Sequence, residues 1–456
     1  MGRPSLNYLT LGGKNRTEKP ARADCAARDG NCVPGVIVMD IGEESVEYHK
    51  KFRGKIGISP KAKITDRKGL SLAYTPGVAQ VCREIAKNPA LAYETTLKSN
   101  SVAVLTDGTR VLGLGNIGAL ASIPVMEGKA MLFREFGGVD AYPICLDLTD
   151  EEKFIEAAKA IAPVFGGINL EDIENPKCYS IEKRLVEELG IPVMHDDQHG
   201  TAVTALAGLQ NALEAAGKKL SESRVAIMGA GAAGSAIALL LARAGCKEVL
   251  CCDRKGVLAA TRADLDSRKA LVAKETKADG EMTFAQACNG ADAIIGASAP
   301  GSITAQDVAA MGSRPIVFSL ANPVQEISLE DAKKAGAFIY ASGRSDLPNQ
   351  INNVLAFPGI FRGALDSRSA KISEGMKLAA ANAISGSLEK GELSAEKIVP
   401  VAFDRHVHFN VALAVALQAQ KEGLAKNKAT MQGLEALISS NLGFQAGRPQ
   451  GQKKQD

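Results

Sequence analysis

The stretch RVAIMGAGAAG, residues 224–234, decides the fold of this chain. An apolar run typical of a buried strand enters a GxGxxG turn, and the run SAIALLLARAG that follows is typical of a helix. The next apolar run, EVLCCD, ends at Asp253, 19 residues after Gly234. In this arrangement the glycines let the backbone approach a pyrophosphate at the helix N-terminus, and the acid accepts ribose hydroxyls. We therefore predict a dinucleotide site formed by Gly229, Gly231, Ala232, Ala233, Gly234 and Asp253.

Similar apolar runs alternate with helical patterns on both sides of this stretch. The expected strands lie within residues 101–108, 141–148, 191–197, 248–253, 292–298, 315–323 and 337–343, and the expected helices include 151–165 and 232–245. This alternation is typical of parallel sheets covered on both faces, and from about residue 370 the pattern becomes helical. Functional groups gather at the carboxyl ends of such strands. The polar residues expected there are Asp107, Asp147, Asp196, Asp253 and Asn322.

Composition narrows the class of protein. The 456 residues are 46% hydrophobic and 23% charged, with a formal net charge of +3. No block of like charge stands out, Trp is absent and aromatic residues make up 4%, so we expect no nucleic-acid partner. No apolar run reaches the roughly 18 residues of a membrane span. Nine scattered cysteines fit reduced thiols, and we predict a cytoplasmic protein with no membrane partner.

The chain divides into four predicted regions. Residues 1–35 are rich in Gly, Pro and Arg and lack apolar periodicity, so we predict a disordered leader there and a disordered tail over 446–456. Between them we predict an N-terminal α/β domain over 36–198. A doubly wound Rossmann domain with C-terminal helices follows over 199–445.

A second GxGxxG motif occurs at Gly113–Gly118, in a different context. Pro124 is expected to interrupt any helix after it, and no strand-end acid follows, so we interpret this motif as a backbone turn that binds no dinucleotide. Two later turns, at Ser298 and at Asn322, end predicted strands and either border the nicotinamide or are ordinary strand-to-loop turns. Asp253 favours NAD, whereas Arg254 and Lys255 could hold the 2′-phosphate of NADP, which leaves a slight preference for NAD.

Two adjacent acid pairs, Glu171-Asp172 and Asp196-Asp197, lie near predicted strand ends. Neighbouring carboxylates repel each other, so two such pairs point to one shared divalent cation, with Mg²⁺ or Mn²⁺ favoured by oxygen ligands. The alternative is a helix N-terminus at which acids complement the dipole. His195 and His199 compete as ligands, but a clean helical turn between them is doubtful and no HExxH pattern is present.

Taken together, several motifs resemble those of malic enzyme in its short bacterial and archaeal form. The resemblance spans residues 40–440, with the motifs in the expected order. They are YTPGV (74–78), TRVLGLGNIGALASIPVMEGKAML (109–132), NLEDIENP (169–176), HDDQHGTA (195–202), VAIMGAGAAG (225–234), SLANP (319–323) and NQINNVLAFPGIFRGAL (349–365). Lys129 and Tyr74 have no distinctive signal of their own outside these motifs.

The resemblance implies oxidative decarboxylation of malate to pyruvate and CO₂ with NAD or NADP and Mg²⁺ or Mn²⁺. It also implies roles for individual residues. Lys129 is the expected base and Tyr74 the expected acid. Glu171, Asp172 and Asp197 are the expected metal ligands, with Asp196 supporting them. Arg110, Asn322, Asn352 and Asn353 are expected to bind malate. The N-terminal domain thus becomes the substrate and metal domain, and the first glycine motif helps to bring Arg110 and Lys129 to the site.

A lysine beside Arg110 and a divalent cation should have a lowered pKa. Asn116 stands where longer relatives often have Asp, and the chain lacks room for their extra segments, so we expect a homodimer. The rival interpretations are a malolactic enzyme that releases lactate, a metal-independent amino-acid dehydrogenase, and a nucleotide-sensing regulator without catalytic groups.

Overall fold

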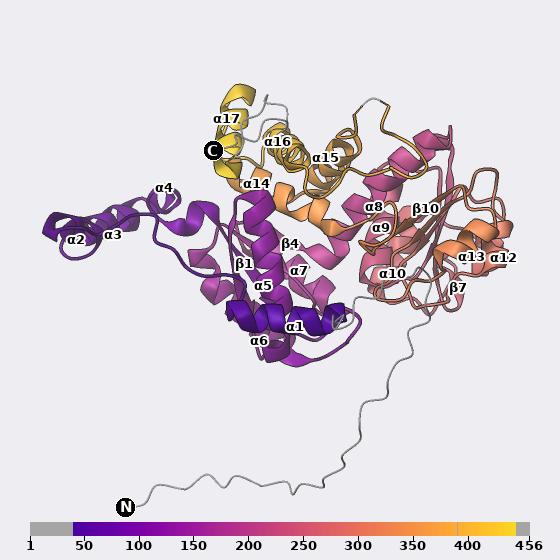
Figure 1. Cartoon of the computed structure of the whole chain (residues 1–456), viewed down its shortest axis with the longest axis horizontal. Helices are drawn as coiled ribbons and strands as arrows, with labels where there is room; N and C mark the ends of the chain where they lie inside the picture. Colours follow the sequence, from indigo (N-terminus) through magenta and orange to yellow (C-terminus); the bar gives the residue numbers. More distant parts are fainter. Residues whose placement is uncertain (1–39, 390, 444–456) are drawn as a thin grey trace, which may run out of the picture. The chain divides into compact units, whose positions relative to one another are not determined.

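The computed structural model describes residues 40–389 and 391–443, and the predicted leader and tail lie outside them (Figure 1). The chain divides into two compact units, residues 1–53 and 54–456. Helix α1 (Ile41–Phe52) is the described part of the first unit. Its N-cap, Asp40, accepts a hydrogen bond from the backbone N–H of Gly42, and acids in the first turn complement the helix dipole.

The second unit contains two sheets, of which the first has four parallel strands. Their order is β2 (Asp140–Cys145), β1 (Ser101–Thr106), β3 (Gly167–Leu170) and β4 (Val193–His195). Helices α5 (Gly118–Gly137), α6 (Glu151–Ile161) and α7 (Lys177–Glu188) belong to the same region. Strand β1 is buried along its whole length, as a strand covered on both faces requires. Phe154 of α6 and Leu170 of β3 share one apolar cluster with it.

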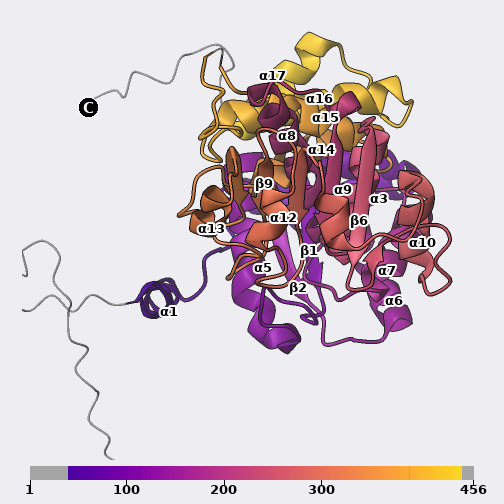
Figure 2. The ribbon, with the colours of Figure 1, turned by 90° about the vertical axis from the view of Figure 1, so that its right-hand side faces the viewer.

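The second sheet has six strands and the doubly wound topology predicted from the sequence. Their order is β10 (Ile339–Ser342), β9 (Ile316–Ser319), β8 (Ala293–Gly296), β5 (Arg224–Met228), β6 (Glu248–Asp253) and β7 (Gly256–Val257), and only β7 is antiparallel. The chain winds one way from β5 to β6 and the other way from β8 to β10. This reversal at β5 and β8 is where such sheets bind ligands. Helices α9 (Ala232–Arg243) and α10 (Ser267–Thr276) pack on each other and on β6 (Figure 2).

Three shorter helices complete this part of the fold: α11 (Phe284–Cys288), α12 (Ala305–Ala309) and α13 (Leu329–Lys334). Each begins with a Thr or Ser whose hydroxyl accepts a backbone N–H three residues later. Cys251 and Cys252 are buried strand residues of β6, as predicted. All seven cysteines of the described residues are free thiols.

Longer helices join the two sheets. Helix α8 (Asp196–Ala215) packs against α9, and α15 (Glu374–Ser385) packs against α8. Helices α14 (Phe357–Asp366), α16 (Arg405–Lys421) and α17 (Met431–Leu442) follow the second sheet in sequence and gather with α15, as the orange and yellow helices of Figure 1 show. Helix α14 also packs on α5, where the ring of Phe357 lies 4.7 Å from that of Phe133. The predicted boundary between residues 198 and 199 falls in the first turn of α8.

Two local predictions are wrong. Pro124 does not break the helix, because α5 continues through it. A proline removes one backbone hydrogen bond, and the eight buried residues of α5 outweigh that loss through packing. The doubted helical turn after His195 also forms, since α8 begins at Asp196 directly after β4.

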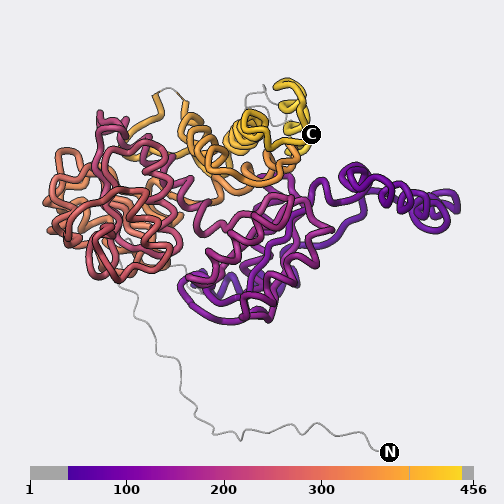
Figure 3. The backbone as a smooth tube through the Cα atoms, turned by 180° about the vertical axis from the view of Figure 1, so that it is seen from behind, coloured from indigo at the N-terminus to yellow at the C-terminus, as the bar shows by residue number. Residues whose placement is uncertain are grey.

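In the segment that precedes β1, most of the apolar side chains are exposed. It holds α2 (Arg67–Ala73), α3 (Val78–Lys87) and α4 (Ala92–Thr95), and none of their residues is buried. These helices are the indigo to violet part of the tube in Figure 3. We call residues 56–81 the apolar arm. Its exposed apolar side chains are Ile56, Ile58, Ile64, Leu70, Leu72, Tyr74 and Val81. Within the described ranges, no helix is both long enough and apolar enough to cross a membrane.

Candidate active site

The two acid pairs lie side by side at the carboxyl ends of neighbouring strands. Strand β3 ends at Leu170 and continues into Glu171-Asp172, and β4 ends at His195 before Asp196-Asp197. The strands are parallel, and Leu170 is paired with His195. Residues that follow a pair of aligned residues in parallel strands leave the sheet at the same end. The strand register therefore places the four carboxyl groups of Glu171, Asp172, Asp196 and Asp197 near one another.

Lys129 of α5 reaches into this group of acids. Its Nζ lies 2.8 Å from Oε1 of Glu171 and 2.6 Å from Oδ2 of Asp196, and 4.3 Å from the centre of the Phe357 ring. The lysine side chain is only 8% exposed. Asn353 donates a hydrogen bond to the same Oδ2 of Asp196. The structure therefore joins predicted residues from four distant segments into one buried constellation.

The lowered pKa predicted for Lys129 depends on a bound cation, and in the chain without one the pKa shifts the other way. Burial lowers the pKa of Lys129, but the negative charges of Asp196 and Glu171 raise it by more, so that it lies above its usual value. The prediction assumed that Arg110 and a cation dominate the field. Two carboxylates lie within hydrogen-bonding distance of Nζ, and Coulomb energy grows as distance shrinks.

Glu171, Asp172 and Asp196 have raised pKa values, as acids crowded together in a buried site should. Burial raises the pKa of Asp172 to about 7, with a further contribution from the charge of Asp197. Burial likewise raises the pKa of Glu171 and of Asp196, although Lys129 opposes it. Each of these shifts would be relieved by a cation that neutralises the negative charge.

Among the residues that the structure describes, the buried Oδ2 of Asp172 and Oδ1 of Asp196 have no hydrogen-bond partner. Unpartnered buried acceptors are costly, and hard cations prefer such ligands. Asp197 is 37% exposed, and its carboxylate accepts the backbone N–H of Asp172 at 2.9 Å. The donor set therefore suits Mg²⁺ or Mn²⁺. Across residues 40–389 and 391–443, no three His, Cys, Asp or Glu side chains already stand close enough to enclose a metal.

The two histidines of this segment differ in their surroundings. His199 uses both ring nitrogens within the protein, because Nε2 lies 3.0 Å from Oε2 of Glu182 and Nδ1 lies 3.0 Å from Nζ of Lys377. His195 is fully buried, with Nε2 3.5 Å from the carboxylate of Asp197. The ring nitrogens of His199 are therefore already engaged by protein partners, whereas those of His195 accept or donate no hydrogen bond among the described residues.

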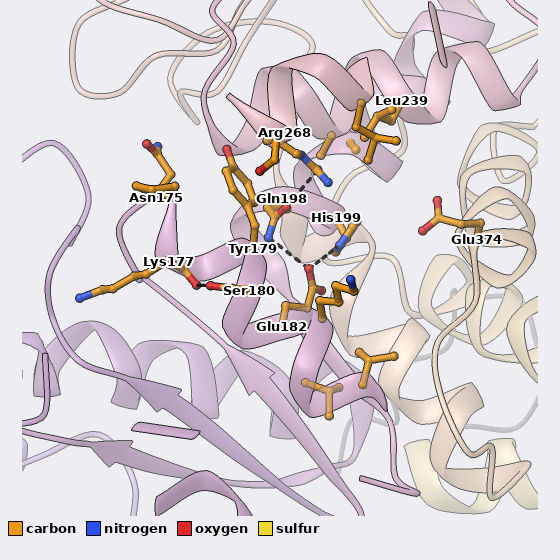
Figure 4. Close-up of a pocket in the computed structure, with 18 of the residues that line it drawn as sticks. Asn175, Lys177, Tyr179, Ser180, Glu182, Gln198, His199, Leu239, Arg268 and Glu374 are labelled. Atoms are coloured by element: carbon orange, nitrogen blue, oxygen red, sulfur yellow. Dashed lines mark hydrogen bonds and ion pairs between the residues drawn. The ribbon is translucent and has the colours of Figure 1, made fainter. Parts of the chain in front are cut away.

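Glu182 of α7 is a residue that the sequence reasoning missed. Its carboxylate accepts the backbone N–H of His195 at 2.8 Å and the side-chain amide of Gln198 at 3.1 Å, and it also contacts His199 (Figure 4). Burial raises the pKa of Glu182, but the positive charges of His199 and Lys377 lower it by more, so that the pKa is about 2. Glu182 thus holds the turn that carries Asp196 and Asp197. The sequence signal that could have identified Glu182 is its position next to Ile181, an apolar residue on the buried face of α7.

Glu182 and His199 line a cavity of about 900 Å³ between α7, α8, α9, α10 and α15. Arg268 stacks 4.8 Å from the Tyr179 ring and donates to Gln198 at 3.1 Å. At another wall Lys377 pairs with Glu374, and Glu374 pairs with Arg243. Figure 4 shows several of these side chains directed into the cavity.

The glycine turn after β5 has the geometry that a dinucleotide needs. Gly229 has φ +112°, and a Cβ there would lie 2.3 Å from the carbonyl oxygen of Ala297. A Cβ on Gly234 would lie 1.8 Å from the carbonyl oxygen of Gly229, whereas Gly231 faces open space to 3.8 Å. Helix α9 begins at Ala232 with no side-chain cap. The first N–H groups, including those of Ala232 and Ala233, are therefore available to a phosphate.

Ser298 and Asn322 lie in the turns that follow the neighbouring strands β8 and β9 of the second sheet. The fully buried Glu326, also missed in the sequence, accepts the N–H of Ser298 at 2.8 Å and that of Ala321 at 3.0 Å. It thereby fixes both strand-end turns. The first glycine motif reaches the same place, because a Cβ on Gly113 would lie 3.1 Å from the carbonyl oxygen of Asn322. That motif thus approaches the turn after β9 closely with its backbone.

Three other predicted site residues, Arg110, Asn352 and Tyr74, make few contacts with the Lys129 constellation among the described residues. Arg110 donates its backbone N–H to the carbonyl of Asp172 at 3.0 Å, with its side chain exposed. Asn352 caps the turn at residues 353–355. Tyr74 is 68% exposed on the apolar arm, and no hydrogen bond, ion pair or ring contact among the described residues links it to Lys129.

Asp253 ends β6 as predicted, but it is not a free acid. Arg262 and Lys269 both form ion pairs with it, at 2.9 Å each. Burial raises the pKa of Asp253, but hydrogen bonds from Arg262 and Lys269 lower it by more, so that the pKa is about 2.

Comparison with known protein families agrees with this geometry. The family model described as the malic enzyme N-terminal domain matches residues 53–153, and that of the malic enzyme NAD-binding domain matches residues 198–420.

Characterised relatives cover most of the chain. It is 49% identical to the bifunctional malic/malolactic enzyme of Bacillus subtilis, over 85% of this chain and 95% of that one. It is also 49% identical to the NAD-dependent malic enzyme of Geobacillus stearothermophilus, over 86% and 82%. The NADP-dependent malic enzyme of Escherichia coli is 43% identical, over 84% of this chain and 53% of that one.

Among solved structures, malic enzyme from Pyrococcus horikoshii superposes with a TM-score of 0.84 at 49% identity. The match covers 89% of this chain and 96% of that chain. Malic enzyme from Entamoeba histolytica superposes with a TM-score of 0.85 at 38% identity, and the match covers 88% of this chain and 86% of that chain. The chain belongs to the malic enzyme family.

Proposed function

We propose that this protein oxidatively decarboxylates malate to pyruvate and CO₂, reducing NAD⁺ or NADP⁺, and that it requires a divalent metal. The observation that carries the proposal is the buried constellation of Lys129, Glu171 and Asp196, which holds a lysine and two acids within 2.8 Å. The contact of Gly113 with Asn322 ties the substrate segment to the dinucleotide sheet.

Glu171, Asp172 and Asp197 are the residues proposed to hold Mg²⁺ or Mn²⁺. Support comes from the unpartnered Oδ2 of Asp172 and from the raised pKa values of Glu171 and Asp172, which a bound cation would offset. When bound, the metal supplies Lewis-acid stabilisation of negative charge on the C2 oxygen of the substrate. The dinucleotide supplies the hydride acceptor.

Lys129 is proposed to take the proton of the C2 hydroxyl. Asp196 and Glu171 hold its Nζ in one position, and the Phe357 ring excludes water from one side. The neutral form of Lys129 that this role requires is favoured when the charge of Glu171 is neutralised by a cation. Asp196 then remains as the acceptor that orients the amine, with Asn353 holding Asp196 in turn.

Arg110, Asn322, Asn352 and Asn353 are proposed to bind the two carboxylates of malate, since a guanidinium and amide donors suit a dianion. Tyr74 is proposed to return a proton to C3 of the product enol. Its exposure and the apolar arm around it support a homodimer in which a second copy covers residues 56–81. The dimer would place Tyr74 at a subunit contact.

A steady-state assay tests the proposal directly. The protein is incubated with malate, either dinucleotide and either Mg²⁺ or Mn²⁺, while nicotinamide reduction is followed and the product identified. Metal-dependent formation of pyruvate with equimolar reduced dinucleotide is expected. Lactate without net reduction would instead establish the malolactic reaction, which the Bacillus subtilis relative makes the specific alternative. Metal-independent turnover of an amino acid would refute both.

A further inference from the structure

Glu326 is a buried carboxylate without a cationic partner. Its side chain is fully buried, yet it forms no ion pair with any Lys, Arg or His that the structure describes. Buried acids elsewhere in the fold do have such partners, since Asp196 pairs with Lys129 and Asp366 with Arg362. A buried charge is costly unless it is paired or hydrogen-bonded. Glu326 therefore keeps a negative charge in the core that hydrogen bonds alone stabilise.

Donors from both strand-end turns hold the carboxylate of Glu326. Oε1 accepts the backbone N–H of Ser298 at 2.8 Å, while Oε2 accepts that of Ala321 at 3.0 Å and the hydroxyl of Ser319 at 2.9 Å. A backbone N–H can only donate, so both oxygens act as acceptors, which is the arrangement of an ionised carboxylate. These dipoles stabilise the charge of Glu326 but leave its net value at minus one, so its field reaches the surrounding residues.

The carboxylate lies directly behind the turn at which the dinucleotide sheet reverses. A Cβ on Gly296, the last residue of β8, would lie 2.6 Å from Cδ of Glu326. The next residue, Ala297, meets the pyrophosphate turn, because a Cβ on Gly229 would lie 2.3 Å from its carbonyl oxygen. Asp253 on β6 belongs to the half of the sheet that takes the adenosine ribose. The nicotinamide therefore belongs over β8 and β9, on the side of Glu326.

The proposed reaction removes a positive charge from this place. Malate gives up a hydride from C2, a proton with two electrons, and the nicotinamide is cationic before that transfer and neutral after it. A nearby negative charge favours binding of the cationic form over the neutral one. We propose that the charge of Glu326, acting from behind the two turns, shifts the selectivity of the site towards the oxidised dinucleotide and so favours release of the reduced one. This inference rests on the dinucleotide site of the proposed function.

The test measures the ratio of two affinities by calorimetric titration of the full chain with NAD⁺ and NADH, and in parallel with NADP⁺ and NADPH. Glu326→Gln removes the charge and keeps the size of the side chain, so the ratio should shift about tenfold towards the reduced form. Glu326→Asp keeps the charge and should leave the ratio within about twofold, even where both affinities fall. Glu330→Gln removes an exposed charge on α13 and should also leave the ratio unchanged.

A purely structural role for Glu326 would lower both affinities by one factor, so an unchanged or opposite ratio in Glu326→Gln would overturn the inference. If that variant does not fold, benzamide adenine dinucleotide tests the wild-type chain, because an uncharged benzamide replaces the cationic nicotinamide in that compound. It should bind about tenfold more weakly than NAD⁺, and equal affinity would overturn the inference. Selective binding by a chain that does not oxidise malate would refute the proposed function alone, whereas no binding of any dinucleotide would refute both.

Discussion

Nζ of Lys129 lies 2.6 Å from Oδ2 of Asp196, although 67 residues separate the two along the chain. Asp196 is fully buried, and it has Lys129 and Asn353 as its partners on that oxygen. A buried charge without its partner is costly, so each of the pair depends on the other for its position.

Lys129→Ala should lower kcat about 100- to 10,000-fold, which is the usual contribution of a positioned base. Affinity for the dinucleotide should stay within about twofold, because Lys129 lies in the first sheet region and not at the glycine turn. Steady-state kinetics and a fluorescence titration with reduced dinucleotide provide the two measurements. Unchanged turnover would remove Lys129 from the proposed chemistry.

Asp197→Ala should abolish Mn²⁺ binding and turnover together, since it removes one of three proposed oxygen ligands. His199→Ala should leave Mn²⁺ affinity largely intact, because both ring nitrogens of His199 are already engaged by Glu182 and Lys377. Electron paramagnetic resonance of free Mn²⁺ measures both affinities. A loss in His199→Ala as large as in Asp197→Ala would establish imidazole ligation instead.

Glu182→Gln tests whether the turn before α8 positions the metal ligands. The glutamine amide would place an NH₂ group against donors whose hydrogen bonds the Glu182 carboxylate now accepts. The free energy of unfolding should therefore fall by about 2 kcal/mol at pH 7. Mn²⁺ affinity should fall as well, although Glu182 is no proposed ligand. Glu187→Gln is the control on the same helix. Lower stability with unchanged Mn²⁺ affinity would show a purely structural role.

The stabilisation from Glu182 should depend on pH. Its pKa is about 2 in the folded chain, below the ordinary 4.5, so the folded state binds its proton more weakly than the unfolded state. The stabilising contribution is therefore complete above about pH 4.5 and is lost as pH falls towards 2. The difference in melting temperature between the wild type and Glu182→Gln should shrink over that range. A constant difference would contradict the low pKa.

Tyr74→Phe and Lys129→Ala together test the proposed dimer. Each variant should be inactive alone. If Tyr74 serves the site of a second copy, mixing and exchanging subunits should restore part of the activity, since some hybrids then hold one intact site. Light scattering should give twice the mass of one chain, and Leu72→Glu on the apolar arm should weaken the dimer. A monodisperse active monomer would contradict the dimer.

Local patterns in the sequence predict the elements well. The run before Gly229 is a strand and the run after Gly234 a helix, and the acids follow β3 and β4 where expected. These features depend on neighbouring residues, through apolar periodicity and backbone hydrogen bonds. One exception is the doubted helical turn after His195, which does form, and the other is Pro124, because the packing of α5 against distant segments outweighs a local penalty.

The sequence by itself determined the order of strands and helices, the glycine turn and the presence of two acid pairs. Only the tertiary structure decided the electrostatics of the sites. It brought Glu182 against the backbone N–H of His195, placed two carboxylates beside Lys129, and paired Asp253 with Arg262. Charges interact through space, so a pKa or a cofactor preference depends on distances between residues that the linear order does not contain.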